Sequence, residues 1–114
     1  MAFDPQDFLS LAQNLTNTST ANEAELRTAV SRAYYAVHLR ARETLVAAGQ
    51  MKSTNSGADH GIVISKLRNR GGSLGDQVDW LRVRRNRADY RLGSPIAAKA
   101  QNIVTVAQAV WPRI

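Results

Sequence analysis

The chain has no cysteine among its 114 residues and only two histidines, His38 and His60. The absence of cysteine excludes disulfides and thiolate metal sites. The two histidines stand in no HExxH or comparable ligand pattern, so we expect no metal site. Because no apolar run approaches the roughly 20 residues that span a bilayer, we also expect no membrane segment.

Motifs for cofactor chemistry are missing as well. There is no nucleophile elbow, and the Gly71-Gly72 pair is not followed by the Lys-Ser/Thr of a phosphate-binding loop. We therefore expect no cofactor. The first eight residues, MAFDPQDF, carry two acids and no positive n-region, which predicts a cytoplasmic protein without a secretory signal.

Charge is the first positive feature of the chain. The net charge is +6, and the whole excess lies in residues 58–114, which hold ten basic and four acidic side chains. Twelve of the fifteen cations are arginine, whose planar fork suits phosphate better than the point charge of lysine does. This pattern favours an anionic partner, with RNA or another nucleic acid first. The alternative is the solvated surface of a small basic protein.

Helical periodicity and helix-boundary signals predict one domain over residues 1–114. Asp4-Pro5 and Ser94-Pro95 pair an N-cap residue with proline at the first helical position. For the longest helix, Thr20 with Glu23 and Asn22 with Glu25 are equally good capping boxes. Asp59 and Ser73 are candidate caps for the next two helices. The fold class is therefore all-α, an up-and-down bundle of four to five helices over about residues 5–15, 22–48, 60–70, 74–91 and 95–111.

The segment LRVRRNRADY, residues 81–90, contains an arginine where the helical pattern requires a hydrophobic residue. An arginine that faces a helix packing needs acceptors or a cleft, because an unpaired buried charge is costly. Arg85 is therefore a candidate functional residue, and an ion pair with Asp89 is the structural alternative. The apolar positions that define the pattern are Leu74, Val78, Leu81, Ala88 and Leu92.

Polar residues on two helices form the candidate site. Arg82, Asn86 and Asp89 lie within one or two turns of Arg85, with Tyr90 beside them. On the longest helix, the segment SRAYYAVH places polar and aromatic groups three and four residues apart. The alternative is that its tyrosines are core aromatics and that His38 is satisfied structurally. The candidate anion-binding residues are Arg82, Arg85, Arg87, Tyr34 and Tyr35.

In order along the chain, ELRTAVSRAYYAVHLRARETL, DHGIVISKL and LRVRRNRADYRL resemble the HEPN domain family. The resemblance covers about residues 22–92. It implies a helical bundle that forms homodimers, often as a metal-independent ribonuclease in toxin–antitoxin or defence systems, and often paired with a minimal nucleotidyltransferase. The family motif is an arginine, a polar residue, three to five further residues and a histidine. Arg85 and Asn86 match its first two positions.

The histidine of that motif does not carry over, since Tyr90, Arg91 and Leu92 occupy its three permitted places. A tyrosine with a pKa near 10 is a poor general base at neutral pH. We therefore expect a dimeric protein that binds a nucleic acid, a nucleotide or a protein partner without strong nuclease activity. The alternative is an endoribonuclease that uses Arg85 and Asn86 with Asp89, Tyr90 or His38 as base. A third reading treats the Arg85–Asp89 region as packing between subunits.

Overall fold

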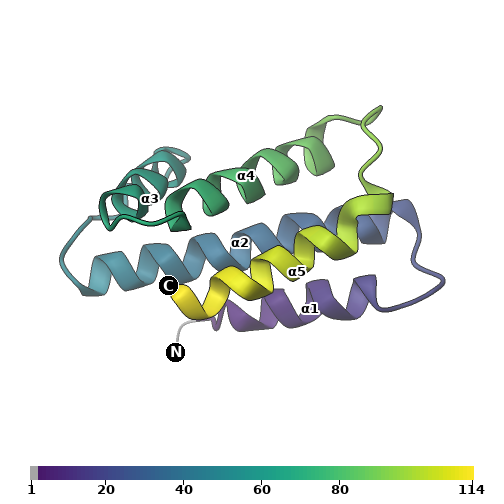
Figure 1. The fold of residues 1–114 in the computed structure, drawn as a ribbon, viewed down its shortest axis with the longest axis horizontal. Coiled ribbons are helices and arrows are strands. Elements are labelled where there is room, and N and C mark those ends of the chain that lie inside the picture. Colours follow the sequence, from purple (N-terminus) through teal and green to yellow (C-terminus); the bar gives the residue numbers. More distant parts are fainter. Residues whose placement is uncertain (1–2) are drawn as a thin grey trace.

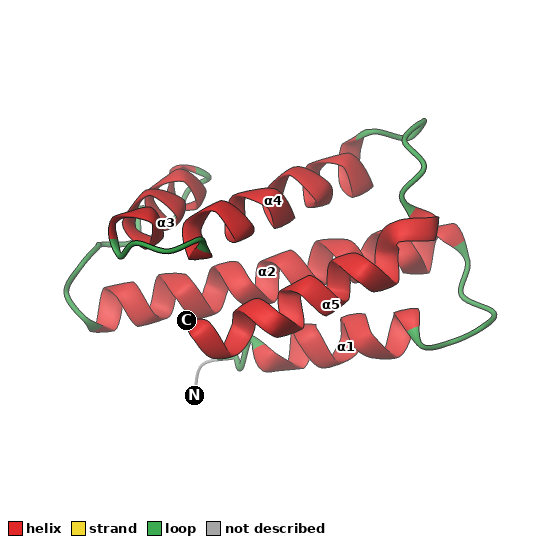
Figure 2. Cartoon of the chain, in the orientation of Figure 1, coloured by secondary structure: helices red, strands yellow, loops and turns green. Residues whose placement is uncertain are grey.

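The computed structural model describes residues 3–114, and over that range it is an all-α bundle without strands (Figures 1 and 2). This confirms the predicted fold class. Two short 3₁₀ helices, η1 (Ala97–Lys99) and η2 (Trp111–Arg113), flank the last α-helix. The five α-helices are α1 (Gln6–Thr16), α2 (Glu23–Ala47), α3 (Ala58–Asn69), α4 (Leu74–Tyr90) and α5 (Ala100–Val110).

Helix α2 is the centre of the bundle and packs against each of the other four α-helices. Its 25 residues span about 37 Å, most of the 43 Å long axis of the molecule. Figure 1 shows α1 and α4 running in one direction and α2 and α5 in the other, with α3 beside the start of α4. Among the described residues, no helix is both long and apolar enough to cross a membrane.

The ends of α2 follow local sequence rules. Of the two possible capping boxes, the structure forms the one between Asn22 and Glu25: the Asn22 side chain accepts from the Glu25 N–H at 2.8 Å, and the Glu25 carboxylate accepts from the Asn22 N–H at 3.0 Å. At the other end, Gly49 adopts a φ of 71°. A residue with a side chain is strained in this left-handed conformation, so glycine ends the helix there.

Three of the predicted helix starts are wrong in detail. Asp59 lies inside α3, whose N-cap is Gly57, so it does not cap that helix. Ser73 is the N-cap residue of α4 but makes no capping hydrogen bond, and the carboxylate of Asp76 pairs with Arg68 of α3 at 2.9 Å. After Pro95 the chain forms η1 before α5 begins, so the fifth α-helix starts later than the Ser94-Pro95 signal predicts.

Helices α3 and α4 come into close contact at Gly75, in the first turn of α4. A methyl group at this position would lie 2.5 Å from Cγ and 2.7 Å from the backbone nitrogen of Arg68. These distances leave no room for a side chain. The glycine thus lets α3 lie directly against α4.

Candidate functional site

The buried face of α4 contains the arginine that the sequence pattern singled out. Leu74, Val78, Leu81 and Ala88 are buried as expected, and Arg85 between them retains only 7% exposure. Leu92 does not continue this face. It lies beyond the last residue of α4 and is 83% exposed.

The guanidinium of Arg85 lies among three tyrosine rings. Its Cζ atom is 5.5 Å from the ring centroid of Tyr34, 5.1 Å from that of Tyr35 and 5.9 Å from that of Tyr90. Its buried Nε atom has no hydrogen-bond partner among the described residues. The negative ring faces of the tyrosines therefore supply much of the stabilisation of this cation.

Asp89 completes the surroundings of Arg85 and also connects α4 to α2. Its Oδ2 atom is 3.7 Å from Arg85 Nη1, an ion-pair distance that is too long for a good hydrogen bond. The same oxygen accepts a hydrogen bond from the Ser31 hydroxyl at 3.1 Å. Beside Arg85, a polar contact between the two helices is thus made by Ser31 and Asp89, while the Arg85–Asp89 pair lies within α4.

A stack of aromatic rings extends from Arg85 toward α3. The buried hydroxyl of Tyr34 is hydrogen-bonded to Nδ1 of His60 at 2.5 Å. The imidazole of His60 stacks on that of His38, with ring centroids 4.1 Å apart and planes inclined by 20°. Tyr35 meets both imidazoles edge-on. Two tyrosines and two histidines therefore form one continuous cluster at the junction of α2 and α3.

Burial and neighbouring charges keep both imidazoles neutral. Desolvation, followed by the proximity of the His60 imidazole and the positive charge of Arg42, lowers the pKa of His38 to about 3. For His60, desolvation and then Arg82 and Arg85 lower the pKa below its ordinary value. Burial raises the pKa of the Tyr34 phenol above its usual range, although Arg82 and Arg85 act in the opposite direction. At neutral pH the positive charge of the site is therefore carried by arginines.

An open cavity of about 530 Å³ lies beside the aromatic cluster. Tyr35, His38 and His60 form one wall, and Arg42 lies at the edge. The opposite wall is the loop before α3, which buried Asp59 holds in place by accepting hydrogen bonds from Ser53 and Thr54. These hydrogen bonds lower the pKa of Asp59 to about 2.

The structure brings together most, but not all, of the predicted site residues. Arg85, Asp89, Tyr34, Tyr35 and His38 meet at the junction of α2, α3 and α4, with Arg82 near enough to shift the pKa of Tyr34 and of His60. Tyr90 also contacts Arg85 although it is 71% exposed, whereas Asn86 is exposed without a hydrogen bond from its side chain among residues 3–114. Arg87 lines a different cavity, between α4 and α5.

Two residues of the site were not predicted from the sequence. They are His60 of α3 and Arg42 of α2, neither of which is among the candidate residues above. The relevant signal was weak: the segment DHGIVISKL places a histidine in the first turn of a helix, but sequence alone does not show that this turn packs on Tyr34.

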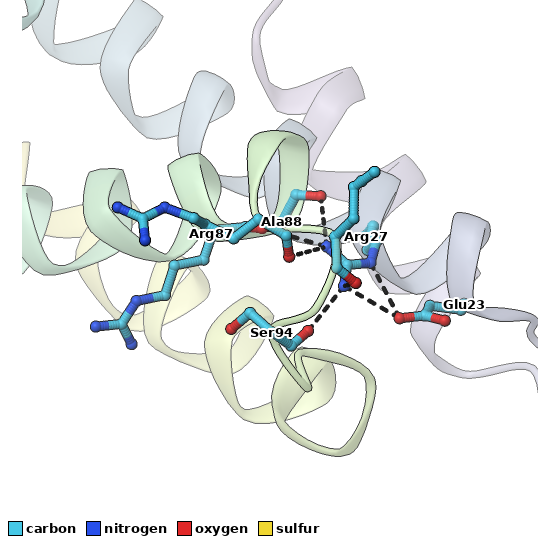
Figure 3. Close-up of polar contacts among 7 residues, drawn as sticks. Glu23, Arg27, Arg87, Ala88 and Ser94 are labelled. Atoms are coloured by element: carbon cyan, nitrogen blue, oxygen red, sulfur yellow. Dashed lines mark hydrogen bonds and ion pairs between the residues drawn. The ribbon is translucent and has the colours of Figure 1, made fainter.

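Arg27 is a third residue that sequence reasoning missed, and it determines where the end of α4 lies. Its guanidinium, 13% exposed, donates to backbone carbonyls at the end of α4 and in the following turn, and it also pairs with Glu23 of its own helix (Figure 3). A cation at a helix C-terminus offsets the negative end of the helix dipole. The five carbonyls belong to Arg87, Ala88, Arg91, Leu92 and Ser94, at 2.7–3.3 Å.

No group of three or more His, Cys, Asp or Glu side chains that could hold a metal ion occurs among residues 3–114. The cluster instead offers neutral imidazoles, phenols and arginines, which suit an anionic ligand with flat rings.

Comparison of the chain with protein-family models, with curated proteins and with solved structures gave no match.

Proposed function

We propose that this protein is an HEPN-like, dimeric RNA-binding component of a toxin–antitoxin or defence-type system. The observation that carries the proposal is the face formed by α2, α3 and α4, where Arg42, Arg82 and Arg85 lie around the cluster of Tyr34, Tyr35 and the two histidines. The sequence resemblance to HEPN domains supports the dimer and a minimal nucleotidyltransferase as a protein partner.

Single-stranded RNA matches this face chemically. Arginine side chains bind phosphates, and unstacked bases pack against aromatic rings. Tyr35 is half-buried and lines the cavity together with His38 and His60. The guanidiniums of Arg32 and Arg85 lie over its ring at 4.9 and 5.1 Å, so a ligand in the cavity meets an aromatic wall with cations beside it. Arg82 makes no ion pair and no side-chain hydrogen bond within residues 3–114, which leaves its guanidinium available for a phosphate.

Replacing Arg82 with alanine is the direct test. We expect Arg82→Ala to weaken binding of a fluorescein-labelled 12-nucleotide single-stranded RNA about tenfold at 50 mM salt, because one phosphate contact is lost. The slope of log K against log salt should fall by about 0.7 for a single strand. Fluorescence anisotropy over a salt series measures both quantities.

The matched control is Arg70→Ala, which removes one exposed arginine at the end of α3, away from the cluster. It changes the net charge equally and should leave both the affinity and the salt slope close to those of the unmodified protein. Equal losses in the two variants would mean that binding follows net charge and would contradict the proposed site.

A second candidate function, metal-independent RNA cleavage, is favoured by the position of His60. The family's histidine is missing from α4, but the cluster contains the imidazole of His60 from α3. His60 contacts Tyr34, and Tyr34 lies beside Arg85. His60 is half-buried and its lowered pKa keeps it neutral and able to accept a proton. His38 is a weaker candidate base, because it is only 3% exposed and its pKa is about 3.

Incubation of the purified protein with single-stranded RNA in EDTA distinguishes the two functions. Binding without cleavage supports the first. Cleavage that disappears in both Arg85→Ala and His60→Ala, but persists in Asn86→Ala and Tyr90→Phe, would identify His60 as the base. Cleavage that persists in Arg85→Ala would exclude this site as its source.

A further inference from the structure

The side of α4 that faces away from the candidate site borders a groove along α5. Three cavities meet there, of about 320, 520 and 430 Å³. The first two share Trp80, and the second and third share Arg87 and Ser94, so they form one continuous surface. From Gln77 to Arg91 it follows α4 for about 20 Å, which equals the length of about six residues of extended peptide.

Four cations line the groove: Arg84, Arg87 and Arg91 of the α4 segment and Lys99 of η1. Within residues 3–114 none of their side chains makes an ion pair or a hydrogen bond. Arg84 is partly desolvated, and burial together with the charge of Arg87 lowers its pKa. Unpaired like charges in one groove repel each other, so an anionic ligand would be stabilised here.

Apolar surface alternates with these cations. Ile96 and Ile103 line the central cavity but are only 3% and 2% exposed. The apolar groups that a ligand can reach are half-buried Trp80 and Val106 at one end and Leu92, 83% exposed, at the other. An exposed leucine beside a basic groove is typical of a protein-binding surface, where apolar anchors are surrounded by charge.

We infer that this groove binds an extended acidic segment of a partner protein that carries apolar side chains between its carboxylates. An extended chain places alternate side chains on one face, so carboxylates about 7 Å apart can pair with Arg84, Arg87 and Arg91 in succession. The apolar side chains between them point to the opposite side of the peptide, toward α5, where half-buried Val106 borders the groove. This partner and surface are distinct from the RNA face proposed above.

RNA fits the groove less well than an acidic peptide does. The guanidinium of Arg84 covers one face of the Trp80 ring, 4.1 Å from its centroid, so a base cannot stack on that face. Exposed Leu92 can pack against an aliphatic side chain of a peptide, whereas a sugar-phosphate chain offers it no aliphatic partner.

The two tryptophans of the chain provide a site-specific readout by NMR. Trp80 lies in the groove, while Trp111 lies at the end of α5 against Arg40. The probe is a capped ten-residue peptide with aspartate at every second position and two leucines between them. In ¹⁵N-labelled protein, we expect this peptide to shift the Trp80 indole signal in a saturable way and to leave the Trp111 signal unchanged.

Three comparisons define the chemistry. A peptide with serine in place of both leucines should bind about tenfold more weakly, a loss of about 1.4 kcal/mol, and a peptide with lysine in place of aspartate should not bind. The double variant Arg84→Glu, Arg87→Glu should weaken binding of the leucine peptide at least tenfold. Its matched control, Lys66→Glu with Arg70→Glu on α3, reverses the same number of charges and should bind normally. The position of the Trp111 signal reports that each variant is folded.

Two outcomes would overturn the inference. The first is that the acidic peptide leaves the Trp80 signal unchanged at millimolar concentration. The second is that a ten-nucleotide single-stranded RNA shifts the signal at lower concentration than the peptide and displaces it. Failure of the RNA face is measured separately, since Arg82→Ala should affect RNA binding alone.

Discussion

Replacing Arg27 with alanine is expected to lower the free energy of unfolding by about 3 kcal/mol. The side chain donates to five backbone carbonyls after residue 86 and lies at the negative end of the α4 dipole. Hydrogen bonds to a charged group contribute about 1.5–3 kcal/mol each. Their sum is reduced here because three carbonyls share one nitrogen and water can replace part of the interaction.

Urea unfolding followed by circular dichroism measures this loss of stability. Two further variants show which contacts of Arg27 cause it. Arg27→Lys keeps the charge near the helix end but cannot reach the same set of carbonyls, so its stability should lie between those of the parent and Arg27→Ala. Glu23→Ala removes only the surface ion pair of Arg27 and should change stability by less than about 1 kcal/mol. If Glu23→Ala were as costly as Arg27→Ala, the carbonyl contacts would not be the source of the stability.

Lowering the pH from 7 to 5 is expected to reduce the free energy of unfolding by about 2 kcal/mol through His38 alone. The folded pKa of His38 is about 3, below the unfolded value of 6.5. Below pH 6.5 the unfolded chain therefore takes up a proton that the folded protein does not. Stability is fully present above pH 6.5 and is lost as the pH falls toward 3.

His60 contributes in the same direction, because its folded pKa is also lowered. Asp59, with a pKa of about 2, loses its contribution only below pH 4, outside this interval. The measurement is a series of urea unfolding curves between pH 5 and 7. In His38→Gln the free energy of unfolding should depend clearly less on pH. An unchanged dependence would contradict the prediction that His38 takes up a proton in the unfolded chain but not in the folded protein.

The sequence predicted those elements whose signals are local. The helices of the bundle, the Asn22–Glu25 capping box and the burial of Arg85 all depend on residues within about one or two turns of each other. Ser73 and Asp76 show the limit of such rules. The same four-residue pattern does not form a capping box, and the carboxylate of Asp76 pairs with Arg68 on the preceding helix.

Features that depend on contacts between helices could not be predicted in this way. His60 of α3 contacts Tyr34 of α2, and Gly75 of α4 lies against Arg68 of α3. Arg87 was grouped with Arg85 because the two are close in sequence. On a helix, however, residues two apart point about 160° from each other, and Arg87 belongs to the groove along α5.

Helix α4 therefore presents two basic surfaces with different surroundings. One has tyrosines and neutral imidazoles beside it, and the other has aliphatic side chains. A ligand on either surface would leave the other accessible, so the two proposals can be tested on one protein sample by separate variants.

The contact of Arg27 with α4 also has a consequence for folding kinetics. It joins residues 60 or more positions apart in the chain, so it closes a long loop and can form only after much of the intervening chain is ordered. Interactions that are absent from the transition state act mainly on the unfolding rate. Arg27→Ala should therefore accelerate unfolding while leaving the refolding rate nearly unchanged, which makes this one side chain a determinant of how long the native state persists.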